Sequence, residues 1–577
     1  MEQIEVIEKS QDDSGRMYKA IKVITSNKTN KPLLVNAEKG VTADAVAQSK
    51  IITDHFRSMF SKDEVEALPE ILPQRMDPPF QREEVEKAVK ALKNNRSAGG
   101  DDLKAEQLKH GPTIVYDKIT EILNEMAETG EHPKEVKEGI LIPLQKPGKP
   151  QGPPSNLRPI ILLSMLRKIL ATLMIWRIGS KIDREIPVSQ AAYRAGRGTT
   201  EQIFTLKTMA EKSITTTNFS THILMMDMSR AFDTINRGRV IEDLRTILTP
   251  SELHIIKLLI ENVRLIVDVS GHRGEAFTTN VGTPQGDCLS PVLFTLYLAK
   301  TLSKIKETPG LPREVQDHSY AEYTDSGVLI NLQYADDICW VGGNCSGAIE
   351  LLKQQIPEIL SEHDLLINLA KTEEYIVNRE ETAWEKCKYL GSTLLTQNDI
   401  KRRNQLANMA FNNLRPILTD KKLATTVKMR IFGALIGSIF LYNSELWALT
   451  KERNQHIDVC QRNLLRKILN IRYPQKISNE NLYARTGQTP WSHTIRTRRI
   501  RWLGHLLRLP VDSPARKALD TFLNYKSKHP PGARKTTWVD TVKKDLKLLD
   551  ITLESCFEIA QDRKVWHSLV VQMSSKS

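Results

Sequence analysis

Residues 328–343 hold two short apolar runs that meet at a pair of acids, in the sequence VLINLQYADDICWVGG. This pattern predicts a β-hairpin whose turn is Ala335-Asp336-Asp337. Asp227 ends another apolar run, HILMMDM, 109 residues before Asp336. Carboxylates at the ends of buried strands are costly unless they are solvated, paired or bound to cations. Because aspartate is also a common turn residue, the pair alone is a weak signal, and the constraint comes from all three acids together.

The chain around this hairpin alternates strand-like and helical segments. VDVSG (267–271) is strand-like, VGTPQG (281–286) is a turn-rich stretch, and LSPVLFTLYLAK (289–300) is an apolar helix pattern. This mixture predicts an α+β fold and not a doubly wound parallel sheet. After about residue 395, long helical patterns rich in Lys and Arg replace the strands.

Positive charge is concentrated in the last third of the chain. Residues 401–577 contain 33 Lys and Arg against 13 Asp and Glu, a charge of +20 that leaves residues 1–400 at −7 within the total of +13. Five of the eight tryptophans lie in the same third, where their rings could stack on bases. The alternative is an ordinary solvated basic surface, but the combination favours a nucleic-acid-binding region.

Membrane insertion and disulfide bonding are both disfavoured by the sequence. The most apolar stretch, residues 431–449, is interrupted by Ser438, Asn443, Ser444 and Glu445, so we expect a buried core helix there. The N-terminus has no signal-peptide pattern, and the six cysteines have neither paired nor zinc-finger spacing. These features predict an intracellular protein in a reducing compartment.

Eight blocks resemble, in order, those of non-LTR (LINE-type) retrotransposon reverse transcriptases. They are IPLQKPGK, NLRPI, AAYRAGRGTTEQI, MMDMSRAFDTI, GTPQGDCLSPVLFTLYL, LQYADDICWV, INLAKTE and KYLGSTL. The resemblance spans about residues 90–395, and TRRIRWLGHLLRL with GARKTTWVDTVKKDL resembles the C-terminal tail of one such lineage. One block departs from the family, which usually shows Pro-Gly-Pro-Asp-Gly character where this chain has SAGGDD.

This resemblance implies a right-hand polymerase with a palm built on an antiparallel sheet. We expect an N-terminal connector over 1–80, fingers and palm over 90–395, a helical thumb over 396–480 and a basic C-terminal nucleic-acid-binding region over 481–577. The implied activity is RNA-directed DNA polymerisation from an RNA template, a DNA primer or target and dNTPs. Such a protein would work in the nucleus and cytoplasm.

The resemblance assigns Asp227 and Asp336 as metal ligands, with Asp337 as the adjacent acid of the turn. Two Mg²⁺ ions are implied, with Mn²⁺ as a substitute, because such ions accept carboxylate oxygens and neutralise a transferring phosphoryl group. Lys371 matches the lysine that protonates the pyrophosphate leaving group. Surface charge is its alternative role.

Five further residues match the nucleotide-binding positions of the family. Lys146 and Arg158 would meet the triphosphate, although either could be surface charge. Gln285 and Gly286 would line the pocket, where glycine permits close backbone approach. Phe232 would pack against the sugar and clash with a 2′-hydroxyl, which favours dNTP over rNTP, or it could be plain core.

Residues 491–508, WSHTIRTRRIRWLGHLLR, combine near-helical apolar spacing with a run of arginines. We expect a helix with one buried face that leaves several arginines free to contact phosphates. A solvated basic helix and a nuclear-import signal are the alternatives. The predicted nucleic-acid contacts are Arg496, Arg498, Arg499, Arg501 and Trp502.

Two rival functions remain at this point. One is a catalytically idle RNA- or DNA-binding protein retained from a decayed element, which three intact acids argue against. The other is an RNA-dependent RNA polymerase, which would need a small or polar residue at Phe232. About 80 residues precede the polymerase blocks, too few for an endonuclease domain, so we expect a polymerase-only chain. The RNA that is copied, the source of the target nick and the oligomeric state stay open.

Overall fold

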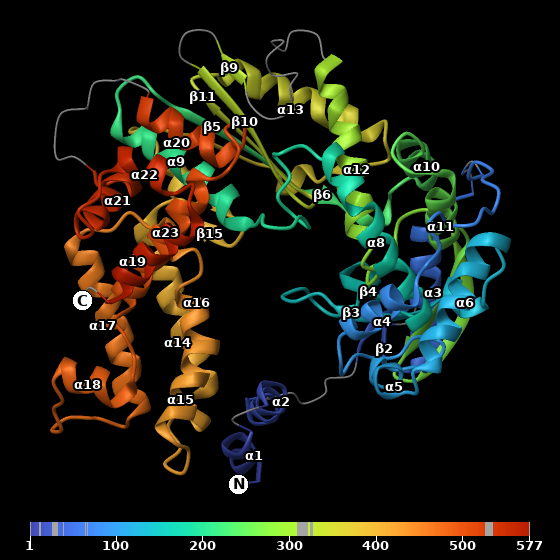
Figure 1. The fold of residues 1–577 in the computed structure, drawn as a ribbon, viewed down its shortest axis with the longest axis horizontal. Coiled ribbons are helices and arrows are strands. Elements are labelled where there is room, and N and C mark those ends of the chain that lie inside the picture. Colours follow the sequence, from blue (N-terminus) through green and yellow to red (C-terminus); the bar gives the residue numbers. More distant parts are fainter. Residues whose placement is uncertain are drawn as a thin grey trace.

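The computed structural model describes residues 2–10, 13–25, 33–37, 40–63, 65, 67–307, 321–323, 327–524 and 535–575. In Figure 1 the chain forms an arch, with the fingers on the right, the palm sheet across the top, and the thumb and C-terminal helices on the left. Strands and helices are mixed in the middle of the chain and helices alone follow, as the α+β prediction required.

The palm is a five-stranded sheet in the order β13-β5-β11-β10-β9, and all its neighbouring strands are antiparallel. Successive side chains of a strand point to opposite faces of the sheet. Both faces of the palm sheet are buried, each in a different hydrophobic core. Helix α9 (Thr199–Thr215) covers one face, whereas α12 (Ser290–Ser303) and α13 (Ser346–Ser361) cover the other. The strands are β5 (Thr221–Met226), β9 (Ala321–Tyr323), β10 (Gly327–Tyr334), β11 (Asp337–Gly343) and β13 (Glu373–Val377).

The fingers contain a second sheet, in the order β4-β3-β7-β8, in which only the β3–β7 pair is parallel. Its strands are β3 (Glu138–Gln145), β4 (Leu157–Leu163), β7 (Val263–Val269) and β8 (His272–Thr279). Helix α3 (Ala45–Phe60) packs Ile52, Phe56 and Phe60 into the core of this sheet. The predicted N-terminal connector therefore includes a structural part of the fingers.

The thumb is a helical unit with its own core. It contains α14 (Thr396–Leu418), α15 (Thr425–Phe432), α17 (Lys451–Ile468) and α18 (Asn479–Thr486). Two N-terminal helices, α1 (Glu2–Lys9) and α2 (Ser14–Thr25), add Ile7, Met17 and Ile21 to that core. The apolar stretch 431–449 lies largely within this core, but it is not the single helix that was expected. A π-helical segment (Gly433–Gly437) follows α15, the helical part ends at Phe440, and a 3₁₀ turn (Ser444–Leu446) comes after it. Among the described residues no helix is both long and apolar enough to cross a membrane.

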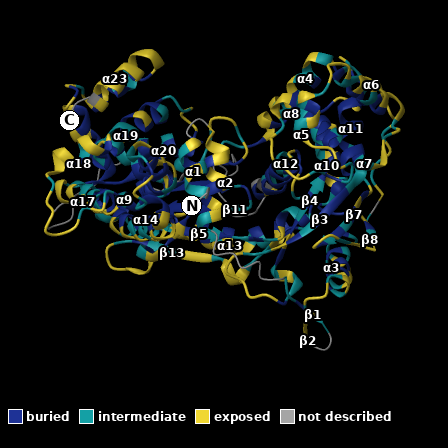
Figure 2. Cartoon of the chain, turned by 90° about the horizontal axis from the view of Figure 1, so that it is seen from below, coloured by how far each residue is buried: buried dark blue, intermediate teal, exposed yellow. Residues whose placement is uncertain are grey.

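The C-terminal helices are α19 (Trp491–Leu507), α20 (Pro514–Asn524), α21 (Trp538–Lys547), α22 (Leu553–Ile559) and α23 (Arg563–Ser575). Their apolar faces share one core with α9 and the palm strands. Helix α19 also supplies Trp491 and Ile495 to the thumb core, so the expected boundary at residue 480 does not separate two cores. Figure 2 shows α23 with exposed residues on its outer side and buried residues facing the body of the protein.

Candidate active site

The three predicted acids lie at one end of the palm sheet. The last residue pair between β5 and β11 is Met226 with Ile338, so the same register continued by one residue sets Asp227 opposite Asp337. The hairpin turn is shorter than predicted, because Tyr334 pairs with Asp337 and only Ala335 and Asp336 form the turn. Local strand pairing therefore brings together carboxylates that are 109 residues apart in sequence.

Burial and mutual repulsion both disfavour ionisation of the hairpin acids. Burial is the larger cause, and together with the charges of Asp336 and Asp227 it raises the pKa of Asp337 to about 6. Burial also raises the pKa of Asp336, and the charge of Asp227 adds to that effect. A bound cation would relieve this repulsion, so the donor set fits a hard divalent metal ion.

Lys371 also binds one of the three acids. Its Nζ lies 2.6 Å from Oδ2 of Asp227, while the backbone N–H of Asn368 donates to the Asp227 carbonyl at 2.8 Å. Within the part of the chain that the structure describes, no three Asp, Glu, His or Cys side chains converge closely enough to form a ready-made metal cage. The chemistry of the acids thus fits a metal ion, and their side-chain arrangement would have to tighten around it.

All five predicted nucleotide-binding residues line one pocket of about 530 Å³, and Asp336 lies at its margin. Lys146 and Arg158 come from the fingers and Phe232 from the palm, so the pocket spans both parts. Asp227, Asp337 and Lys371 line an adjoining pocket, together with Lys388 and Tyr389. The acid-bearing turn therefore stands between two pockets.

Gly286 is required by the close approach of two backbone segments. It has φ +128°, and a Cβ atom there would lie 2.5 Å from the carbonyl oxygen of Ile161. The N–H of Ile161 donates to the Gln285 carbonyl at 2.8 Å, which joins this loop to the fingers. The Gln285 side chain donates to Asp233 at 3.0 Å, and burial raises the pKa of Asp233 to about 6.

Phe232 both packs against the core and lines the pocket. Its ring packs against Phe294, with 4.4 Å between ring centroids, and the same residue lines the nucleotide-sized pocket. It follows Arg230, whose φ of +55° is unusual for a residue other than glycine. That turn of the backbone precedes the short 3₁₀ helix Ala231–Asp233, which carries Phe232.

Several residues of the pocket were missed from sequence. His55, Tyr193 and Arg230 line it, and Arg230 contributes, after burial itself, to lowering the pKa of Lys146. No local pattern marks His55, because only tertiary packing brings α3 to the pocket. Asp287 also lines the pocket, and it forms a buried ion pair with Arg167 at 2.9 Å.

The prediction that α19 leaves its arginines free is wrong for most of the helix. Arg499 is only 2% exposed and pairs with Asp545, while Arg496 lies 3.5 Å from the same carboxylate. Arg498 donates to the Leu441 carbonyl at 2.8 Å, and Trp502 is buried against Phe204. Of the five predicted contacts only Arg501 is exposed. Three of the arginines are thus held within the protein, Arg496 and Arg499 by the Asp545 carboxylate and Arg498 by a backbone carbonyl.

An antiparallel palm with acids at the turn of its β10–β11 hairpin, beside a pocket to which the fingers contribute Lys146 and Arg158, is the arrangement of a right-hand nucleic-acid polymerase. Residues 144–394 match the family described as "Reverse transcriptase (RNA-dependent DNA polymerase)". Over this region the chain is similar to the reverse transcriptases of non-LTR (LINE-type) retrotransposons.

The relatives are all distant in sequence. The "Probable RNA-directed DNA polymerase from transposon BS" of Drosophila melanogaster is 25% identical over 68% of this chain and 45% of its own length. The "RNA-directed DNA polymerase from mobile element jockey" of Drosophila funebris is 27% identical over 45% of this chain and 27% of its own length. This chain thus spans less than half the length of these relatives. Among solved structures, apo telomerase from Candida tropicalis aligns with a TM-score of 0.39 and 14% identity, over 76% of this chain and 69% of that one.

Proposed function

We propose that this protein is an RNA-directed DNA polymerase that extends a DNA primer or nicked DNA target on an RNA template. The observation that carries the proposal is the placement of Asp227, Asp336 and Asp337 at the end of the palm sheet, beside a pocket that holds all five nucleotide-site candidates. Phosphoryl transfer depends chiefly on positioning and on neutralising charge, and this site offers both.

In the proposed reaction the primer 3′-hydroxyl attacks the α-phosphate of a dNTP, and the bond from the α-phosphate to pyrophosphate breaks. Lys146 and Arg158 would hold the triphosphate, since both line the pocket. The Gly286 backbone would let the nucleotide approach closely, and Gln285 would offer amide hydrogen bonds. Phe232 would exclude a ribose 2′-hydroxyl.

The acids would hold two Mg²⁺ ions, for which Mn²⁺ could substitute. The chemistry that such ions would supply there is to offset the negative charge of the transferring phosphoryl group. Lys371 would protonate the departing pyrophosphate, and it would have to exchange Asp227 for that new partner. The protein would act in the nucleus and cytoplasm, where its nucleic-acid partners are found.

Primer extension tests this function directly. Asp336→Asn should lower extension on an RNA template by several orders of magnitude and leave template binding nearly unchanged, because it removes a metal-binding carboxylate. Asp512→Asn is a matched control, since Asp512 is exposed and lies in the C-terminal region. Near-normal extension by Asp336→Asn would contradict the metal assignment. A parent protein that binds template but never extends a primer would instead support the idle-protein alternative.

A further inference from the structure

A short segment between α8 (Met165–Glu185) and α9 runs along the edge of β10 that faces away from β11, in the acid-bearing hairpin. We name residues 187–197 the strap. The backbone of Gln333 in β10 donates to the Ser189 carbonyl at 3.0 Å and accepts from the Ala191 N–H at 3.0 Å. The strap therefore pairs with β10 just before the turn that carries Asp336.

The side chain of Gln190 bonds to the turn itself. Its Nε2 donates to the carbonyl of Ala335 at 3.3 Å, and its Oε1 accepts from the Ala335 N–H at 3.1 Å. Oε1 also accepts from the N–H of Ala192, and the side chain is fully buried. One amide thus satisfies both backbone polar groups of Ala335, and the Ala335 carbonyl belongs to the peptide bond that begins Asp336.

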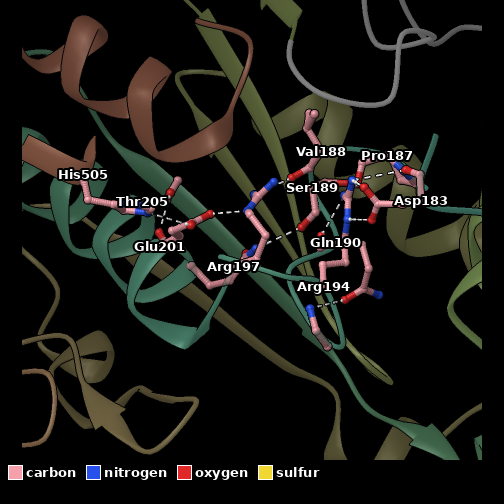
Figure 3. A network of polar contacts seen from close by, with 12 residues as sticks. Asp183, Pro187, Val188, Ser189, Gln190, Arg194, Arg197, Glu201, Thr205 and His505 are labelled. Atoms are coloured by element: carbon pink, nitrogen blue, oxygen red, sulfur yellow. Dashed lines mark hydrogen bonds and ion pairs between the residues drawn. The ribbon is translucent and has the colours of Figure 1, made fainter. Parts of the chain in front are cut away.

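The strap is anchored at several points, which Figure 3 shows together. Arg194 holds both carboxylate oxygens of Asp183, at 2.6 and 3.2 Å, and donates to the Gln190 carbonyl at 3.2 Å. Arg197 donates to Glu201 at 2.5 Å and to the Val188 carbonyl at 2.8 Å. These two arginines therefore tie the strap to α8 and to α9, the helices that flank it.

The turn needs external support because Ala335 has φ +56°, a conformation that L-residues other than Asn and Asp rarely adopt. Two hydrogen bonds from a buried, anchored amide stabilise that conformation.

We propose that Gln190 is a positioning residue that fixes the peptide bond between Ala335 and Asp336 and so sets where the Asp336 carboxylate lies. Gln190 does not touch a substrate and acts only through the turn. The inference rests on the proposed polymerase function, because it assigns Gln190 a part in the same site.

Gln190→Met is the main test, since it keeps the side-chain volume and removes both hydrogen-bonding groups. Extension at saturating primer-template should show kcat lowered by about 10- to 100-fold, with the KM for dNTP changed by less than about threefold, because a small misplacement of a reacting group costs this much. Electron paramagnetic resonance of Mn²⁺ added to the protein without nucleic acid should show weaker binding. Gln190→Glu keeps the accepting oxygens but loses the donor to Ala335, and we expect a loss in the same direction.

Gln461→Met is the matched control for stability. Gln461 is also a fully buried glutamine whose amide donates to a backbone carbonyl, that of Thr489 at 2.9 Å, and accepts from a backbone N–H, that of Trp491 at 2.8 Å. It lies in the thumb, away from the turn, so its replacement should lower the melting temperature without changing kcat or Mn²⁺ affinity. If Gln190→Met matches Gln461→Met in all three measurements, Gln190 only stabilises the fold and the inference is overturned. If the parent protein neither extends primers nor binds Mn²⁺, the proposed function fails instead.

Discussion

At the scale of single residues, the shape of the pocket depends on the absence of a side chain at one position and on an unusual backbone conformation at another. Gly286 leaves room for the Ile161 carbonyl, and Arg230 takes a left-handed backbone conformation just before Phe232. Sequence alone could nominate Gly286, Gln285 and Phe232 because each stands in a recognisable block. It could not nominate Gln190 as a partner of Ala335, since those residues are 145 positions apart and no periodicity links them.

Phe232 provides a prediction at this scale. Phe232→Val should raise the use of rNTPs relative to dNTPs, because a smaller side chain relieves the clash with a 2′-hydroxyl. The ratio of kcat/KM for the two nucleotides on one primer-template measures the effect. The loss of ring contact with Phe294 should also lower stability, by about 1 to 3 kcal/mol. An unchanged nucleotide ratio in a folded variant would leave Phe232 as a core residue only.

At the scale of elements, the sequence predicted the strands of the palm hairpin better than it predicted which residues pack against a helix. The palm hairpin follows from a local alternation of apolar residues and a turn, so its existence and its acids could be read directly. Helix α19 was placed correctly as a helix, but its arginines were assigned to solvent. The partner that buries Arg499, Asp545, lies 46 residues further along the chain, in α21. A charge run says nothing about such long-range pairing.

Two arginines of α19 should therefore behave differently. Arg499→Ala removes the main partner of a buried carboxylate, which destabilises proteins by about 3 to 5 kcal/mol, and urea unfolding should show it. Arg501→Ala should leave stability nearly unchanged because Arg501 is exposed. If Arg501 contacts a phosphate, its removal should flatten the slope of log affinity against log salt by about 0.7 to 0.9. Equal salt slopes for Arg501→Ala and the parent would remove the last predicted contact of this helix.

At the scale of the whole molecule, the C-terminal helices are joined to the palm and do not form a separate module. Helix α9 packs between the palm sheet and the C-terminal helices, and Figure 1 shows these elements stacked at the upper left of the arch. At this joint, Glu211 of α9 accepts a hydrogen bond at 2.8 Å from the N–H of Trp538, the first residue of α21. The sequence could predict a basic C-terminal third. It could not predict that this third packs against the palm, because the shared core forms between distant parts of the chain.

The contact between Glu211 and Trp538 should make the stability of the protein depend on pH. Burial raises the pKa of this carboxyl from 4.5 to about 7, although the hydrogen bond from Trp538 and the charge of Lys207 oppose the shift. The folded protein then keeps a proton that the unfolded chain has lost, so the contribution of Glu211 to stability falls as pH rises from about 4.5 through about 7. Over that pH range the free energy of unfolding should fall by about 3 kcal/mol because of Glu211 alone.

Glu211→Gln isolates this contribution, because an amide keeps an acceptor for the Trp538 N–H and does not ionise. The free energy of unfolding of the variant relative to the parent should be nearly constant below pH 4.5. Between pH 4.5 and about pH 8, the variant should become progressively more stable relative to the parent. A difference that does not vary with pH would show that Glu211 titrates normally in the folded protein.

The shared core also has a consequence for the order in which the chain can fold during synthesis. Phe204 of α9 packs edge-on against Trp502 and Trp538, with ring centroids 5.8 and 4.8 Å apart. The outer side of α9, the helix that covers one face of the palm sheet, therefore cannot be covered until the ribosome has made the C-terminal helices. Long-range contacts of this kind slow folding and leave apolar surface exposed in the meantime. A nascent chain would carry its finished catalytic hairpin while Phe204 and its apolar neighbours on α9 were still exposed to solvent.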